Sequence, residues 1–250
     1  PALWELLLRK DLLVEISTGG PPYQVILGAP HHAAPQVEQI AENWVNPSTG
    51  LRGRPADETT GLSGLAVLAA LGEAGISARL VIAVHPTGHD PNKTTGCPYW
   101  ESIFASPLPA LLLELHGAGK TRRHDLELSA GRNQRTDPLW FGKRLAAHLP
   151  VSWTLAVQKR SGTREAFLLN QDHSTGGAIT GRLENPALST PSLSFAGDLG
   201  MLALHLEMKA FLRQPDPSFP QSPRPAPDAW QLARALAAVI QELVQPAASF

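Results

Sequence analysis

Four nearly unbroken apolar runs constrain the fold of this chain more than any other feature. They cover residues 23–27, 78–84, 108–115 and 201–208, and the segments 61–72 and 138–149 read as helices. A strand that is apolar on both sides must be covered on both faces, which is typical of a sheet flanked by helices. We therefore predict an α/β fold, a single domain with a mixed, largely parallel sheet.

The 250 residues suffice for one sizeable domain, and we assign residues 1–213 to it. Residues 214–227 are so rich in proline that we predict a stiff connector there. Asp228 is then expected to cap a terminal helix within residues 228–250. The apolar face of this helix must pack on the domain or on a second subunit, so a homo-oligomer is one of the arrangements open to the chain.

The charge balance and the residue types exclude several classes of protein. Lys and Arg number 21 against 22 Asp and Glu, which lacks the basic excess of a nucleic-acid or membrane binder. No apolar run approaches the roughly 20 residues of a membrane span, and the first residues do not resemble a secretory signal. We therefore expect a cytoplasmic protein. The single cysteine, Cys97, excludes a multi-cysteine metal site, but nine histidines allow one built from His and carboxylate.

Three apolar runs end in a side chain that can bind a metal or move a proton. These side chains are His31, His116 and Glu207. Groups at the carboxyl ends of neighbouring strands converge in one crevice of an α/β sheet. Two histidines and a carboxylate would form a three-ligand zinc set with a fourth position open to water. The best candidate for the carboxylate is Glu58, with Asp57 as the alternative.

Two further carboxylates stand inside apolar strands. Glu114 lies two residues before His116, so alternation places both on the same side of a strand. Glu114 could then accept a hydrogen bond from the second ring nitrogen of His116, as the carboxylate behind a metal-binding histidine often does. Glu207 within its apolar run is costly to bury unless it has a partner, which indicates a functional role.

Several short motifs resemble, in order along the chain, those of the N-formylglutamate amidohydrolase family. They are Pro30-His31 after a strand, Asp90-Pro91-Asn92-Lys93, Glu114-Leu115-His116-Gly117, the short acidic strand and glycine turn at 125–131, and His205-Leu206-Glu207 followed by Arg213. That family is similar in fold to the zinc carboxypeptidases and the aspartoacylase group. The resemblance therefore implies a zinc-carboxypeptidase-like fold.

The resemblance also implies an activity, a zinc-dependent amidohydrolase that cleaves an amide bond of a small acyl-amino acid or peptide-like substrate. Zn²⁺ would be held by His31, Glu58 and His116, and Glu207 would be the general base. The adjacent His32 leaves open which of the two histidines is the ligand.

The resemblance also suggests a substrate site, and the expected mechanism calls for a cation near the reacting carbonyl. Asn92 and Lys93 would engage a carboxylate of the substrate, although lysine stands where the family has arginine and so lacks the bidentate fork. Arg132 or Arg54 would stabilise the oxyanion that forms during hydrolysis. The glycine-rich segment 170–186 is either a loop that covers the substrate or a plain surface loop.

Two other classes of function remain as alternatives. One is a non-catalytic binding module on the same fold, which would hold no metal. The other is a nucleotide hydrolase, because residues 117–121 read GAGKT; however, the glycine that a phosphate-binding loop requires is replaced here by Glu114. A serine hydrolase is disfavoured because Ser63 falls within a predicted helix and lacks the elbow spacing.

Overall fold

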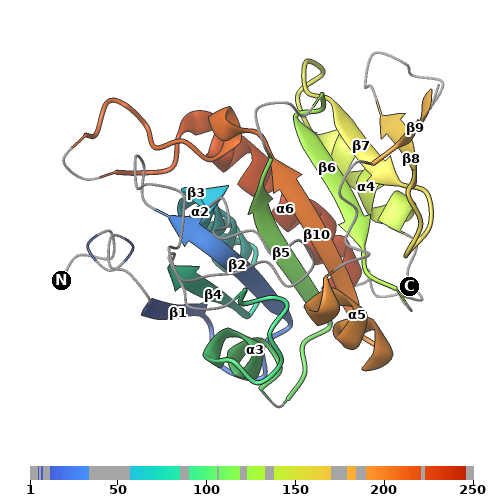
Figure 1. Ribbon diagram of the computed structural model, residues 1–250. Helices are drawn as coiled ribbons and strands as arrows, with labels where there is room; N and C mark the ends of the chain where they lie inside the picture. The colour runs from blue at the N-terminus through green and yellow to red at the C-terminus, as the bar shows by residue number, and fades with distance from the viewer. Residues whose placement is uncertain are drawn as a thin grey trace, which may run out of the picture.

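One mixed sheet organises the molecule in the computed structural model (Figure 1). The structure describes residues 5, 7, 12–33, 57–84, 90–105, 107–118, 123–132, 138–169, 179–183, 190–220 and 223–245. The strands are β1 (Leu12–Thr18), β2 (Val25–Ala33), β3 (Asp57–Glu58), β4 (Ala78–Val84), β5 (Leu111–Gly117), β6 (Leu126–Ala130), β7 (Leu155–Gln158), β8 (Glu165–Leu169), β9 (Ile179–Arg182) and β10 (Leu202–Met208). They form the order β1-β4-β2-β5-β10-β6-β7-β8-β9, and β3 pairs with β2 outside this path.

The centre of the sheet is parallel and its flanks are mixed. Strands β4, β2, β5 and β10 run parallel to one another, and β3 runs parallel to β2. Strands β1, β6, β8 and β9 each have an antiparallel neighbour, while β7 runs parallel to β6. The predicted mixed α/β sheet is confirmed. Figure 1 shows the arrowheads of β2, β5 and β10 directed toward the same edge, where polar side chains from these strands can meet.

One face of the sheet is covered by three helices, α2 (Thr60–Glu73), α4 (Pro138–His148) and α6 (Pro227–Val244). Every second residue of the central strands joins their apolar side chains in the main core, as Leu113 of β5 and Leu204 of β10 do. Helix α6 packs along α2, and both contribute to this core. No helix in the described part of the chain is long and apolar enough to cross a membrane.

On the opposite face, the described part of the chain has two short helices and a strip of polar residues. Two short helices, α3 (Pro98–Ile103) and α5 (Pro191–Asp198), pack there on the first residues of the central strands. Beyond them, toward the carboxyl ends of the strands, the outward positions carry polar residues: Glu114 and His116 on β5, His205 and Glu207 on β10, and Glu127 and Ser129 on β6. This polar strip, defined by these six residues, lies beside the cluster described below.

Several elements differ from the sequence prediction. Helices α3 and α5 and strands β8 and β9 were not predicted, and β9 falls within the segment 170–186 that was read as a loop. The proline-rich segment is folded back on itself by a bridge between Pro215 and Pro225. Helix α6 begins at Pro227 with Ala226 as its cap, so Asp228 lies in the first turn. Because prolines cannot donate backbone hydrogen bonds, the described part of the proline-rich segment does not form a regular strand ladder and makes this bridge instead.

Asp125 connects β6, β7 and β10 near the carboxyl end of β10. Its Oδ2 accepts hydrogen bonds from the backbone N–H and the hydroxyl of Thr154, at 2.8 and 2.9 Å, and its Oδ1 lies 3.1 Å from Nζ of Lys209. Burial opposes the charged carboxylate, but these partners outweigh it and lower the pKa of Asp125. The contact therefore stabilises the fold above the ordinary pKa of 3.8 and is lost as the pH falls below it.

We expect Asp125→Asn to lower the free energy of unfolding by about 1–2 kcal/mol at pH 7, because a charge-assisted contact is lost. At pH 3 the two proteins should differ less, because below pH 3.8 the unfolded chain takes up a proton on this carboxylate and unfolding of the wild type becomes more favourable. Urea unfolding at both pH values measures this. The exposed Glu73→Gln is the control and should differ from wild type by the same small amount at both. An undiminished difference for Asp125→Asn at pH 3 would contradict the ionic contribution.

Candidate metal centre

A bulge in β2 determines which of two adjacent histidines enters the cluster. Ala29 pairs with Ile82 of β4, but the next pair along the strands joins His32 to Val84, so β2 has one residue more than its neighbour. Such a bulge interrupts the alternation of side chains. Ala29, Ile82 and Val84 all belong to the main core, so His32 also lies on the core side of the sheet. The side chain of His31 contacts His116 on the other side.

Three side chains meet at the carboxyl ends of the central strands: His31 from β2, Asp57 from β3 and His116 from β5. The Nδ1 atom of His31 lies 3.3 Å from Nδ1 of His116 and 3.4 Å from Oδ2 of Asp57. The Nδ1 atom of His116 lies 3.1 Å from the same oxygen. The three atoms therefore form a nearly equilateral triangle.

This triangle has the size of one face of a zinc coordination tetrahedron. In a tetrahedral site with bonds of about 2.0–2.1 Å, two ligand atoms lie roughly 3.3–3.4 Å apart. The observed edges of 3.1–3.4 Å agree with that spacing. Two imidazole nitrogens and one carboxylate oxygen are also ligand types that zinc prefers. The residues present thus fit a zinc ion in both geometry and chemistry.

The outer nitrogens of the two histidines face carboxylates. Nε2 of His31 lies 2.9 Å from Oδ1 of Asp90, and Nε2 of His116 lies 3.7 Å from Oε2 of Glu114. A carboxylate can only accept a hydrogen bond, so it favours the tautomer with the proton on Nε2. In that tautomer the Nδ1 atoms, which form two corners of the triangle, can bind a metal ion. Carboxylates placed behind metal-binding histidines in this way orient the imidazole rings toward the ion.

Charges within the cluster also favour a positive centre. Burial opposes the charged form of Asp57, but hydrogen bonds and charges from His116 and His31 outweigh it and hold the pKa of Asp57 well below its usual range. Burial likewise opposes a charged His116, but Asp57 and Glu114 outweigh it and raise its pKa to about 9. In the metal-free protein the cluster therefore holds a proton; a metal ion would take the same place.

Glu114 is a fully buried carboxylate held by several donors. The hydroxyls of Tyr99 and Ser192 donate to its Oε1 at 3.2 and 2.8 Å, and Nδ2 of Asn92 donates to its Oε2 at 3.3 Å. Burial raises its pKa, but His116, His205 and the hydrogen bond from Ser192 outweigh burial and lower it, so the group is ionised. Gly28 makes room for this arrangement, because a Cβ atom there would lie 2.1 Å from the hydroxyl of Tyr99.

Glu207 lies beside the cluster on the neighbouring strand. It is the register partner of His116 in the parallel pair of β10 and β5, so both side chains project from the same face. Its Oε1 lies 3.2 Å from Nε2 of His205, and its side chain is 12% exposed. Burial opposes its charge, but the hydrogen bond from His205 and the charges of His205 and His116 lower its pKa. Glu207 is thus ionised and able to accept a proton.

His205 is a site residue to which the sequence reasoning gave no role. Its ring stacks on that of His116, with centroids 3.9 Å apart and planes inclined by 22°. Burial and the charge of His116 lower the pKa of His205, and its Nε2 can donate to the carboxylate of Glu207. The alternation that pairs Glu114 with His116 also pairs His205 with Glu207, and this signal could have found it.

The backbone of β3 is held so that Asp57 reaches the histidines. The guanidinium of Arg213 donates from Nε to the carbonyl of Met208 at 3.0 Å and from NH1 to the carbonyl of Glu58. Burial lowers the pKa of Arg213, while the negative charges of Asp57, Glu58 and Glu207 oppose this change. The carboxylate within the triangle belongs to Asp57; Glu58, the preferred ligand of the sequence analysis, is not one of its three members.

The other predicted site residues occupy different places. Asn92 is 1% exposed and its amide contacts Glu114, while Lys93 is 35% exposed and its Nζ lies 3.3 Å from Oδ2 of Asp90. Arg132 follows the end of β6, which runs antiparallel to β10, so it lies at the opposite edge of the sheet from Glu207. The structure does not bring Arg132 to the cluster. Arg54 lies outside the described residues, as do residues 119–121 of the GAGKT motif and most of 170–186.

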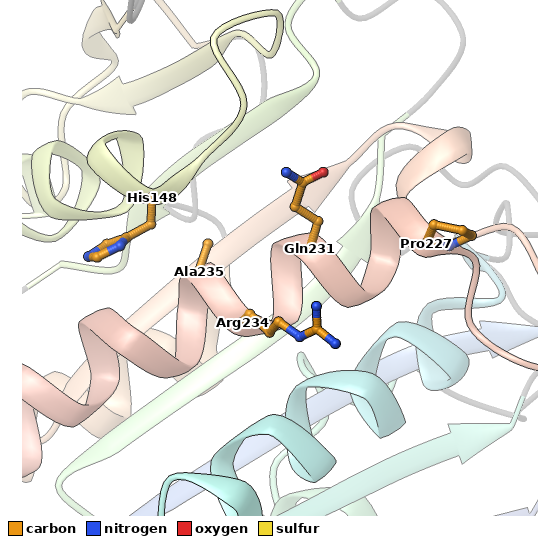
Figure 2. Close-up of a pocket in the computed structure, with 5 residues that line it drawn as sticks. All are labelled: His148, Pro227, Gln231, Arg234 and Ala235. Atoms are coloured by element: carbon orange, nitrogen blue, oxygen red, sulfur yellow. The ribbon is translucent and has the colours of Figure 1, made fainter.

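A hollow on the other face of the sheet is separate from the cluster (Figure 2). It lies at helices α4 and α6 and is lined by His148, Pro227, Gln231, Arg234 and Ala235. Figure 2 shows Gln231 and Arg234 leaving α6 in different directions, so their polar ends do not converge on one point. Helices α4 and α6 cover the core face, and the sheet therefore stands between this hollow and the triangle.

Comparison with known proteins identifies similar chain arrangements. No protein-family model matches the sequence, and no curated protein sequence matches it. Similar solved structures include a bacteriophage poly-gamma-glutamate hydrolase (TM-score 0.49, 12% identity, 92% of this chain and 89% of that one). An N-formylglutamate amidohydrolase from Ralstonia eutropha JMP134 gives a TM-score of 0.45 at 12% identity, over 94% of this chain and 97% of that one. The family that the sequence resembles is thus among them.

A third similar structure is a metallo-carboxypeptidase from Burkholderia cenocepacia, with a TM-score of 0.46 and 13% identity. The match covers 91% of this chain but only 59% of the carboxypeptidase, so this chain spans little more than half the length of that protein. At such low identity the likeness concerns the course of the chain alone. The activity of this protein has to be argued from its own side chains.

Proposed function

We propose that this protein is a zinc-dependent hydrolase that cleaves an amide bond in a small acyl-amino acid or peptide-like substrate. The observation that carries the proposal is the triangle of His31, Asp57 and His116, whose edges match a zinc coordination face. A three-residue ligand set leaves a fourth position for water, which is typical of catalytic rather than structural zinc sites. Bound zinc would activate water and polarise the scissile carbonyl.

Glu207 is the base in this proposal. It is ionised, partly exposed and adjacent in register to His116, so it can take a proton from an attacking water and return it to the leaving nitrogen. His205 supports this role because its Nε2 donates to Oε1 of Glu207, and Oε2 would then accept the proton of the water. Stacking on His116 fixes the ring of His205 in turn.

Binding of the substrate is proposed for the rim of the cluster. Lys93 keeps a third of its side chain exposed and could attract a substrate carboxylate, although it also pairs with Asp90. Asn92 would act indirectly, since its amide holds Glu114 behind His116. Arg213 is a second cation near the cluster, buried within range of the charges of Asp57, Glu58 and Glu207.

Metal removal tests the proposal directly. The purified protein should contain about one zinc per chain and hydrolyse at least one member of a panel of N-acyl amino acids and short peptides. A chelator should abolish that hydrolysis and added zinc should restore it. His116→Ala should lose the zinc, whereas His148→Ala, on the other face of the sheet, should keep it. Zinc that is unaffected by His116→Ala would exclude this site as the metal centre.

A further inference from the structure

His32 stands next to a proposed ligand but belongs to a different environment. The bulge in β2 turns it toward the core face, where it is fully buried against the start of α2. A buried imidazole needs partners for its nitrogens, and Nδ1 of His32 has one: it accepts the backbone N–H of Gly61 at 3.0 Å. Its position is that of a support for α2, on the far side of β2 from the triangle.

Helix α2 begins without a cap of its own. The first N–H groups of a helix have no partner within it and usually receive one from the side chain of the cap residue. Here the cap residue Thr59 has a φ of 62° and its side chain makes no capping bond; its hydroxyl donates to the carbonyl of Glu58 instead. His32 supplies the missing acceptor from the neighbouring strand.

The same few residues hold the proposed ligand Asp57. His32 pairs with Asp57 in the short parallel ladder of β2 and β3. The next residue, Ala33, accepts the N–H of Thr59 at 2.8 Å, and the hydroxyl of Thr60 donates to the carbonyl of Asp57 at 3.1 Å. Asp57 is therefore held between β2 and the first turn of α2.

The ring of His32 packs closely against the first turn of α2. A Cβ atom on Gly61 would lie 3.0 Å from Cγ of His32 and 3.1 Å from its Nδ1. A side chain at this position would require the ring or the helix to move by a few tenths of an ångström. The contact thus fixes the turn of residues 59–61 against β2, and Asp57 lies two residues before that turn.

We propose that His32 is a positioning residue of the metal centre: as the cap of α2 it fixes the carboxylate of Asp57 at the distance from His31 and His116 that one ion requires. The inference rests on the proposed function in taking that ion to be zinc. His31 and His32 thus divide two tasks, one as ligand and the other as the support of a second ligand.

Two substitutions separate the cap from the ring. His32→Leu removes the acceptor and leaves the N–H of Gly61 buried without a partner, whereas His32→Asn keeps an oxygen at nearly the position of Nδ1. We expect His32→Leu to weaken zinc binding by about 10–100-fold, the usual effect of losing support behind a metal ligand. His32→Asn should restore most of the affinity.

The affinity is measured by competition with a chromophoric chelator at a temperature at which every variant is folded by circular dichroism. Val67→Ala, in the buried face of the same helix, is the matched control, because it should lower the melting temperature and leave zinc affinity unchanged. Gly61→Ala perturbs the contact from the helix side and serves if His32→Leu does not fold. Amide hydrogen exchange at Gly61 measures the capping hydrogen bond in the absence of zinc. The exchange rate should increase in His32→Leu but not in His32→Asn.

The outcomes distinguish this inference from the proposed function. Wild-type affinity in both His32→Leu and Gly61→Ala would overturn the positioning role. Loss of zinc in both His32 variants, with zinc retained in His31→Ala, would overturn it as well, since His32 would then be the ligand. If the wild-type protein binds no zinc, the proposed function fails; unchanged exchange at Gly61 in His32→Leu would separately show that His32 is no cap.

Discussion

Replacing Asp57 by asparagine is expected to reduce the affinity of the protein for zinc by roughly a hundredfold or more, since losing a ligand should exceed the 10–100-fold effect of losing a supporting residue. Oδ2 of Asp57 closes the triangle with both histidines, at 3.4 and 3.1 Å. An amide oxygen could still reach the ion but carries no charge, so the neutralisation of the metal by a carboxylate is lost. Zinc competition titration measures the effect in the folded protein.

Glu58→Gln is the matched control for this experiment. It makes the same change from carboxylate to amide one residue along β3, at the position that the sequence analysis preferred as ligand. Zinc affinity should change little, because Glu58 is not a member of the triangle. The reverse result, with zinc lost in Glu58→Gln and kept in Asp57→Asn, would return the ligand role to Glu58.

The sequence could not decide whether His31 or His32 enters the cluster, and the reason is physical. Gly28 of β2 lies on the face of the sheet that carries the cluster. Strict alternation from Gly28 would place Pro30 and His32 on that face as well. The bulge shifts the pattern by one residue, so that His31 faces the cluster instead. Proline within a central strand is a signal of such an interruption, and Pro30 stands at this point.

Features that depend on one regular strand or helix were predicted well. Strand β4 has the predicted bounds, 78–84, and α2 extends the predicted helix of 61–72 by one residue at each end. Alternation predicted Glu114 and His116 on one side of β5, and in the structure Oε2 of Glu114 lies 3.7 Å from Nε2 of His116. In each case the periodicity of a single element carried the information.

Features that depend on how strands pair were not accessible in this way. In the sequence, Arg132 comes just after a predicted strand, in the same way that His31 and His116 come at the ends of predicted strands. Strand β6, however, runs antiparallel to β10, so its carboxyl end lies at the edge away from the cluster. Nothing in the residues 126–130 states this direction, because a buried strand has the same pattern in either orientation.

Glu207→Gln should lower kcat about 10²–10⁴-fold, the usual contribution of a general base, on the best substrate found in the panel. The amide cannot accept the proton of the attacking water, although its size and its contact with Nε2 of His205 are kept through its oxygen. Zinc content should remain at the wild-type level, because Glu207 is not a member of the triangle. Steady-state kinetics and metal analysis of the same preparation provide both readings.

The matched control is Glu127→Gln on β6. Glu127 is the register partner of Glu207, is 5% exposed, and projects from the same face of the sheet. It differs from Glu207 in lying one strand further from His116, so its replacement should leave kcat nearly unchanged. Because both variants remove one negative charge from the same polar strip, a general electrostatic effect would lower kcat in both alike. A large loss in Glu207→Gln alone would identify the base by its position next to the metal ligand, whereas equal losses would remove Glu207 from that role.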